Sequence, residues 1–174
     1  MSGTLLLPHG MYRDRIVTAS RRQMDRGWQS NRIVDRCRTL IAGFMRGDRS
    51  LGIQQLQIGR GLAEWDEAPP AGPPATVQQL TDTAPFVVSL TPRQIRYVDA
   101  GGVPDRHPTN RLEIVVTLAA NEPPLRRGET DYAMREFGLF GDFGGEAYMI
   151  NYVRHPVLHK QAGDTLTRTI RLVF

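Results

Sequence analysis

Residues 133–174 read AMREFGLFGDFGGEAYMINYVRHPVLHKQAGDTLTRTIRLVF, and this stretch decides the fold. Apolar residues alternate with polar ones over 166–174, as in a strand with one buried face. The glycines and the aspartate at 142–145 predict a tight turn that joins strands 133–140 and 147–153 as a hairpin. The end of the chain therefore predicts three consecutive strands.

The same patterns extend the sheet toward the N-terminus. Residues 111–118 show the clearest alternation in the chain, and apolar runs at 53–58 and within 86–98 predict further short strands. One helix is predicted over about 30–46, because apolar residues recur there at three- and four-residue spacing and Gly47 can end it. The predicted fold class is α+β: a mainly antiparallel β-sheet or sandwich with this principal helix packed on it.

The helix stripe and one sheet face are predicted to share a single core. Cys37, the one cysteine, lies on that stripe, which excludes an internal disulfide and predicts a buried, unreactive thiol. The predicted core residues are Ile33, Cys37, Leu40, Phe44, Leu112, Ile114, Val116, Leu139, Ile150, Ile170 and Leu172.

Residues 1–27 lack a sustained period and are predicted to form an extended N-terminal arm, with a short helical turn near 16–24. Residues 28–174 are predicted to form one domain. The arm carries both apolar side chains and arginines, so we expect it to become ordered against a neighbouring subunit. The hypothetical interface residues are Leu5, Leu6, Leu7, Tyr12, Arg13, Arg15, Arg21, Arg22, Trp28, Arg135 and Glu136.

The charge is concentrated near the N-terminus. Residues 13–49 hold ten arginines and four aspartates, a net of +6 within a total of +4, so the rest of the chain is slightly acidic. This asymmetry suits an acidic partner surface. Nucleic-acid phosphates are the alternative partner, but little beyond Trp28 could stack on bases, and we do not expect direct nucleic-acid contact.

No catalytic, metal or cofactor site is predicted, and the chain is not expected to be an enzyme. His155 and His159 have a ligand spacing only on a helix, which Pro156 disfavours. Arg135 and Glu136 are consecutive in a strand, so their side chains are expected on opposite faces. No run approaches the ~20 apolar residues that span a bilayer, and the first residues do not read as a secretory signal, so we expect production in the cytoplasm.

Several phrases of this sequence occur together in one known module. Near the end, Arg135-Glu136 is followed by Gly138, Leu139 and Phe140, then by the pair Asn151-Tyr152, and then by the strand from Thr165 to Phe174. Upstream, Gly59 and Gly61 precede Trp65, Asp66, Pro69 and Pro70. Over roughly 31–174 the chain resembles the N-terminal, baseplate-attachment domain of phage tail-collar fibre proteins.

The resemblance implies a structural protein of a phage tail or of a related contractile injection machine, located in the virion tail or the particle. Its implied partners are other tail or baseplate proteins and copies of itself, in trimeric or six-fold placement, and the Arg-Glu pair is implied to be structural. The module normally precedes a fibre shaft, whereas this sequence ends at Phe174 and has about 30 extra residues at its start. We therefore expect a baseplate or tail-fibre anchor or adaptor. The alternative is a tail or neck protein that contacts nucleic acid through the basic region.

Overall fold

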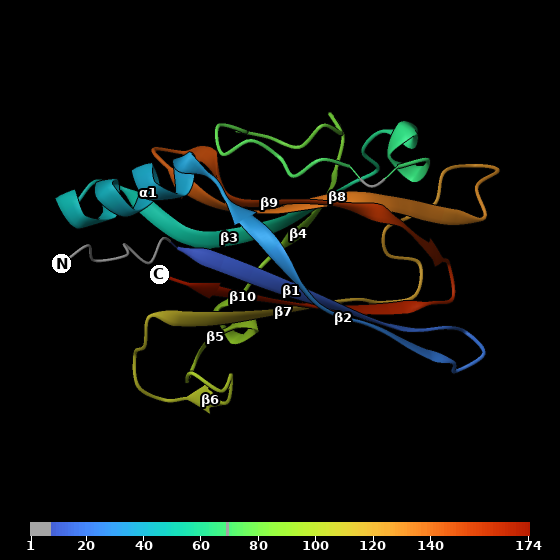
Figure 1. The fold of residues 1–174 in the computed structure, drawn as a ribbon, viewed down its shortest axis with the longest axis horizontal. Helices are drawn as coiled ribbons and strands as arrows, with labels where there is room; N and C mark the ends of the chain where they lie inside the picture. Colours follow the sequence, from blue (N-terminus) through green and yellow to red (C-terminus); the bar gives the residue numbers. More distant parts are fainter. Residues whose placement is uncertain (1–7, 69) are drawn as a thin grey trace.

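Antiparallel strands dominate the computed structural model, which describes residues 8–68 and 70–174 (Figure 1). The described residues form one α-helix, α1 at Asp35–Arg46, and 3₁₀ helices at Ala63–Asp66 and Pro92–Gln94. Their strands are β1 His9–Val17, β2 Gln23–Ile33, β3 Ser50–Gly59, β4 Phe86–Ser89, β5 Ile95–Val98, β6 Pro104–Asp105, β7 Arg111–Leu118, β8 Asp131–Phe143, β9 Glu146–Gln161 and β10 Thr165–Val173. The predicted α+β class, a mainly antiparallel sheet with one principal helix, is confirmed.

The strands follow the order β4-β3-β8-β9-β2-β1-β10-β7-β5-β6, and the paired neighbours are antiparallel. The link between β9 and β2 is short, because it consists of the pairs Arg32–Tyr152 and Ile33–Asn151. At this link the sheet folds over, so that β4, β3, β8 and β9 form one layer and the remaining strands form the other (Figure 1). The result is a two-layered sandwich.

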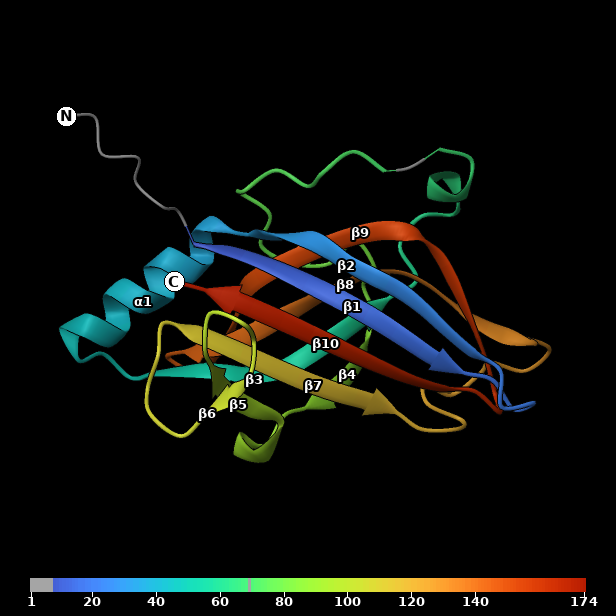
Figure 2. The same cartoon turned by 60° about the horizontal axis from the view of Figure 1, so that its bottom comes forward.

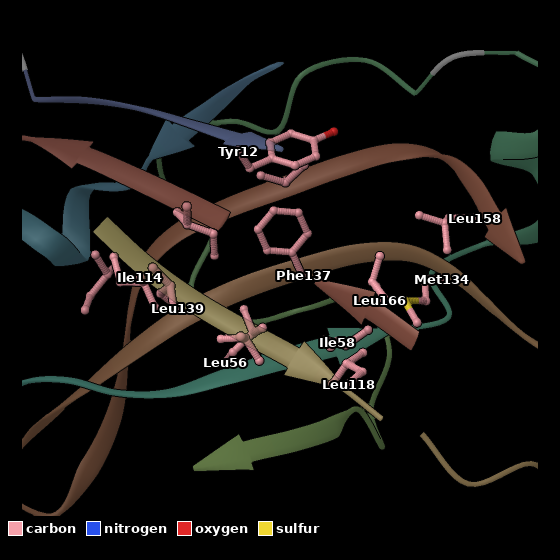
Figure 3. Close-up of a cluster of buried hydrophobic side chains, with 14 of the residues drawn as sticks. Tyr12, Leu56, Ile58, Ile114, Leu118, Met134, Phe137, Leu139, Leu158 and Leu166 are labelled. Carbon is pink, nitrogen blue, oxygen red and sulfur yellow. The ribbon is translucent and has the colours of Figure 1, made fainter. Parts of the chain in front are cut away.

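Side chains from both layers meet in one apolar core (Figure 3). Leu166 and Ile170 of β10 point inward and are fully buried, as are Leu56 and Ile58 of β3 and Phe137 of β8. These predicted core residues are buried: Cys37, Leu40, Ile114, Val116, Leu139, Ile150, Ile170 and Leu172.

Three of the predicted core residues behave differently. Ile33 and Leu112 are partly buried and pack against the edge of the core. Phe44 is 64% exposed, so its assignment to the core is wrong. The apolar stripe of the helix is therefore wider than the sheet surface that it packs against.

The predicted N-terminal arm is wrong for the part of it that the structure describes. β1 lies inside the sheet, between β10 and β2, and Tyr12 and Ile16 are buried in the core. The expected helical turn near 16–24 is instead the turn of the β1–β2 hairpin, in which the N–H of Thr18 donates to the carbonyl of Arg22 at 2.9 Å. The residues of the arm that fall outside the described ranges include Leu5, Leu6 and Leu7.

α1 begins at Asp35, later than predicted, because residues 30–33 belong to β2. It ends at the predicted place. Gly47 has a φ of 82° and its N–H donates to the carbonyl of Phe44 at 3.1 Å. Glycine adopts this left-handed conformation without steric cost. The helix packs on β9, β3 and β8 at one end of the sandwich (Figure 2).

One ion pair lies within the core. Asp14 of β1 is directly opposite Arg168 of β10, and both side chains are almost fully buried. The guanidinium donates from Nε to Oδ1 at 2.7 Å and from Nη2 to Oδ2 at 2.6 Å. Burial opposes ionisation of Asp14, but Arg168 outweighs it and holds the pKa of the carboxyl below its usual range. Removing either partner would leave the other charge unpaired in the interior.

We expect replacement of Ile16 by Ala to lower the free energy of unfolding by about 2–4 kcal/mol, because the side chain is 3% exposed in the core. Val17→Ala on the same strand, where the side chain is 38% exposed, should cost less than about 1 kcal/mol. Urea denaturation measures both. A loss at Ile16 no larger than that at Val17 would mean that β1 is not part of the folded core.

His155 should make stability depend on pH. Burial, and then the nearby Arg168, lower its pKa from 6.5 to about 4, while Asp14 acts in the opposite direction and Arg26 adds to the lowering. Below pH 6.5 the unfolded chain therefore binds a proton that the folded protein rejects. The free energy of unfolding should fall by about 1–2 kcal/mol between pH 6.5 and pH 5.

Urea titrations across this range test the expectation. His155→Gln should remove most of the slope. An equal slope in the wild type and in His155→Gln would show that His155 is not the titrating group.

Candidate protein interface

Glu136 of β8 fastens the long connection between β3 and β4 to the sheet. Its fully buried carboxylate accepts hydrogen bonds from the backbone N–H groups of Thr81 at 3.0 Å and Asp82 at 2.6 Å, and from the hydroxyl of Tyr152. Gly59 leaves room for it, since a Cβ there would lie 2.5 Å from the carboxylate. Because Glu136 is inaccessible, the hypothesis that it contacts another subunit is wrong.

Arg135 holds the beginning of the same connection. It donates to the carboxylate of Asp66 at 2.7 and 2.6 Å and to the carbonyl of Arg60 at 2.9 Å. These hydrogen bonds hold the pKa of Asp66 below its usual range. The β8–β9 register shifts between Met134 and Glu136, and such a bulge lets consecutive side chains reach one loop. The expectation that Arg135 and Glu136 serve separate faces is therefore wrong.

The other hypothetical interface residues that the structure describes lie on the β1–β2 hairpin. Tyr12 is 4% exposed and packs edge-on against Phe137, so its interface role is wrong. Arg13 and Arg15 both bind the carboxylate of Asp25, with their Nε atoms at 2.8 and 3.2 Å. The remaining exposed members are Arg21, Arg22 and Trp28.

Apolar side chains are exposed on α1 and beside it, and the sequence patterns did not predict this surface. Phe44 is 64% exposed and Met45 is 83% exposed. Beside them, between α1 and the strands, runs a groove of about 220 Å³. The side chains along it are almost all apolar: Cys37, Leu40, Ile41, Phe44, Met45, Ile53, Ile95, Leu112, Ile150 and Phe174.

The groove exists because α1 is apolar over more of its circumference than the sandwich can cover. Cys37 and Leu40 are buried against the sheets. Gly43 allows close packing, since a Cβ at this position would lie 2.3 Å from the ring of Phe143. The apolar side chains beside this contact, Phe44 among them, project past the sheets. They form one wall of the groove.

The groove offers apolar contact and no reactive group. Burial raises the pKa of the Cys37 thiol to about 11, so the thiol is protonated near neutral pH. His155 is inside the core, and His159 bonds through Nδ1 to Asp131 at 2.8 Å. Within residues 8–68 and 70–174, no group of three His, Cys, Asp or Glu side chains could hold a metal ion. The groove is therefore a candidate docking surface.

Comparison with known proteins yields no relative: the chain matches no protein-family model, no curated protein and no solved structure. No helix in the described part of the chain is long and apolar enough to cross a membrane.

Glu136→Gln should lower the free energy of unfolding by about 1–3 kcal/mol, because an amide NH₂ would face at least one of the three donors that the carboxylate now satisfies. Hydrogen exchange of the amides of Thr81 and Asp82 should also become faster. Glu146→Gln, the same change at the exposed first residue of β9, is the matched control. If both variants unfold alike, the carboxylate does not fasten the connection.

Proposed function

We propose that this protein is a structural component of a phage tail or of a phage-tail-like contractile injection machine. It acts as a baseplate or tail-fibre anchor or adaptor, through contacts with other proteins. The observation that carries the proposal is the apolar groove along α1, with Phe44 and Met45 exposed on its rim. Contiguous apolar surface of this kind on a folded protein is typical of sites where another protein binds.

The residues behind the resemblance also support a structural role. The Arg-Glu and Asn-Tyr phrases lie next to each other on β8 and β9 and bond directly: Tyr152 donates to Glu136, and the N–H of Leu139 donates to Asn151 Oδ1 at 2.7 Å. Arg135 and Glu136 fix the β3–β4 connection on the sheet, and Asn151 joins β9 to β8. Residues of a sequence signature that hydrogen-bond to one another in this way serve to stabilise the fold.

The proposed partners are other tail or baseplate proteins and further copies of this chain, in trimeric or six-fold placement. The occupant of the groove is an apolar segment of such a neighbour, with Phe44 and Met45 as the anchoring side chains. Placement in a symmetric particle would remove this surface from water, as interfaces in closed assemblies do. The protein would then be located in the tail or injection particle.

The alternative, a tail or neck protein that contacts nucleic acid, is less well supported. Part of the N-terminal positive charge is already neutralised, because Arg13 and Arg15 bind Asp25 and Arg46 binds Asp48. Titration with duplex DNA at about 50 mM salt separates the two functions, since electrostatic association is strong there. Tight binding that weakens steeply with added salt would favour the alternative.

The double change Phe44→Asp and Met45→Asp should leave the fold intact, because both side chains are largely exposed. It should reduce incorporation into tail particles about tenfold or more, since it places two charges in an apolar interface. Quantitative mass spectrometry of purified particles measures incorporation. Val103→Asp, at a 60% exposed loop position, is the control and should incorporate normally. Normal incorporation of the double variant would contradict the proposal.

A further inference from the structure

A second cavity opens where β2 separates from β9. The two strands pair at Arg32–Tyr152 and Ile33–Asn151, and a cavity of about 450 Å³ lies beside these pairs. α1 and residues 72–75 of the β3–β4 connection also border it. The connection is fixed there because the N–H of Asp35 donates to the carbonyl of Ala75 at 2.9 Å.

The cavity is strongly basic. Three arginines line it: Arg32 of β2, Arg38 of α1 and Arg154 of β9. Its lining residues include no aspartate or glutamate. Within residues 8–68 and 70–174 the Arg32 side chain has no hydrogen bond or ion pair. Arg38 lies 3.7 Å from Asp35, and both side chains are more than half exposed, so this pair is weak. Most of the positive charge is therefore uncompensated.

Arg154 is held in place by aromatic rings. Its guanidinium lies 5.0 Å from the ring centroid of Trp65 and 5.2 Å from that of Tyr152. Its Nε donates to the hydroxyl of Tyr152 at 3.3 Å, and that hydroxyl is itself bonded to Glu136. In the described part of the chain its two terminal nitrogens make no hydrogen bond, so they are available to a ligand. A guanidinium fixed in this way loses little freedom on binding.

Asn31, beside the same cavity, carries a buried amide. It is among the lining residues, and its Oδ1 and Nδ2 atoms are both buried with no hydrogen-bond partner among the described residues. Buried side-chain amides in folded proteins are almost always hydrogen-bonded.

We propose that this cavity binds a carboxylate of an acidic peptide segment on a partner protein. The planar guanidinium matches a carboxylate with two parallel hydrogen bonds. The aliphatic part of such a peptide would contact apolar side chains that line the cavity: Pro8, Ile33, Pro73 and Val153. A pocket of this size encloses a side chain or two, whereas nucleic acid presents a long row of phosphates that needs an open groove.

The identification of the partner as a protein rests on the proposed docking function, but the test needs no particle. Fluorescence anisotropy measures the binding of a labelled short peptide of alternating leucine and glutamate, and of its glutamine counterpart, to the purified chain. The glutamate peptide should bind and the glutamine peptide should not. Arg32→Gln should weaken binding about tenfold or more, because it removes a charge-assisted contact. Arg106→Gln removes the same charge from an exposed loop outside the cavity and should change affinity less than about twofold.

Three results would overturn the assignment. The first is no binding of the glutamate peptide, or equal binding of the glutamine peptide. The second is an equal loss in both arginine variants, which would reduce the effect to net charge. The third is displacement of the peptide by a short DNA duplex when the total concentration of DNA phosphate is lower than that of peptide carboxylate. This result would mean that the cavity prefers phosphates. None of these results bears on the incorporation of the Phe44 variant, so the two proposals fail separately.

Discussion

The apolar stripe of α1 is wider than the sheet surface beneath it, and the surface chemistry of this end of the molecule follows from that mismatch. Cys37 and Leu40 complete the core, and Gly43 brings the helix against the ring of Phe143. The same close approach leaves Phe44 and Met45 outside. Under the proposed function, a neighbouring protein would cover these side chains and remove them from water.

Two buried carboxylates hold separate parts of the sandwich together. Asp14 neutralises Arg168 between β1 and β10, so a charged sequence can form an interior strand. Glu136 replaces the water that two loop amides and the Tyr152 hydroxyl would otherwise bind, and it keeps the β3–β4 connection on the sheet. That connection in turn borders the arginine-lined cavity beside α1. The apolar groove runs along α1 from Cys37 to Met45, and the basic cavity lies at Arg38, near the start of the same helix.

Local patterns predicted most of the strands and the end of the helix, because alternation and a terminal glycine act over a few residues. β1 was missed because Arg13, Asp14 and Arg15 interrupt its apolar period, and what neutralises Asp14 is Arg168, far along the chain. The exposure of Phe44 was missed for a related reason: a stripe shows which residues are apolar, not how much sheet lies beneath them. The basic cavity depends on where β2 and β9 separate, which is a long-range pairing that no local pattern encodes.

Solvent protection of Met45 tests the central claim most directly. This side chain is 83% exposed in the isolated protein, whereas Met24, 39% exposed on the hairpin that extends away from α1, provides an internal comparison (Figure 2). Methionine oxidation by dilute peroxide, followed by mass spectrometry, reads both sites. In purified tail or injection particles Met45 should oxidise about tenfold more slowly than in the isolated chain. Oxidation at an unchanged rate in the particle, or particles that lack the chain, would contradict the account.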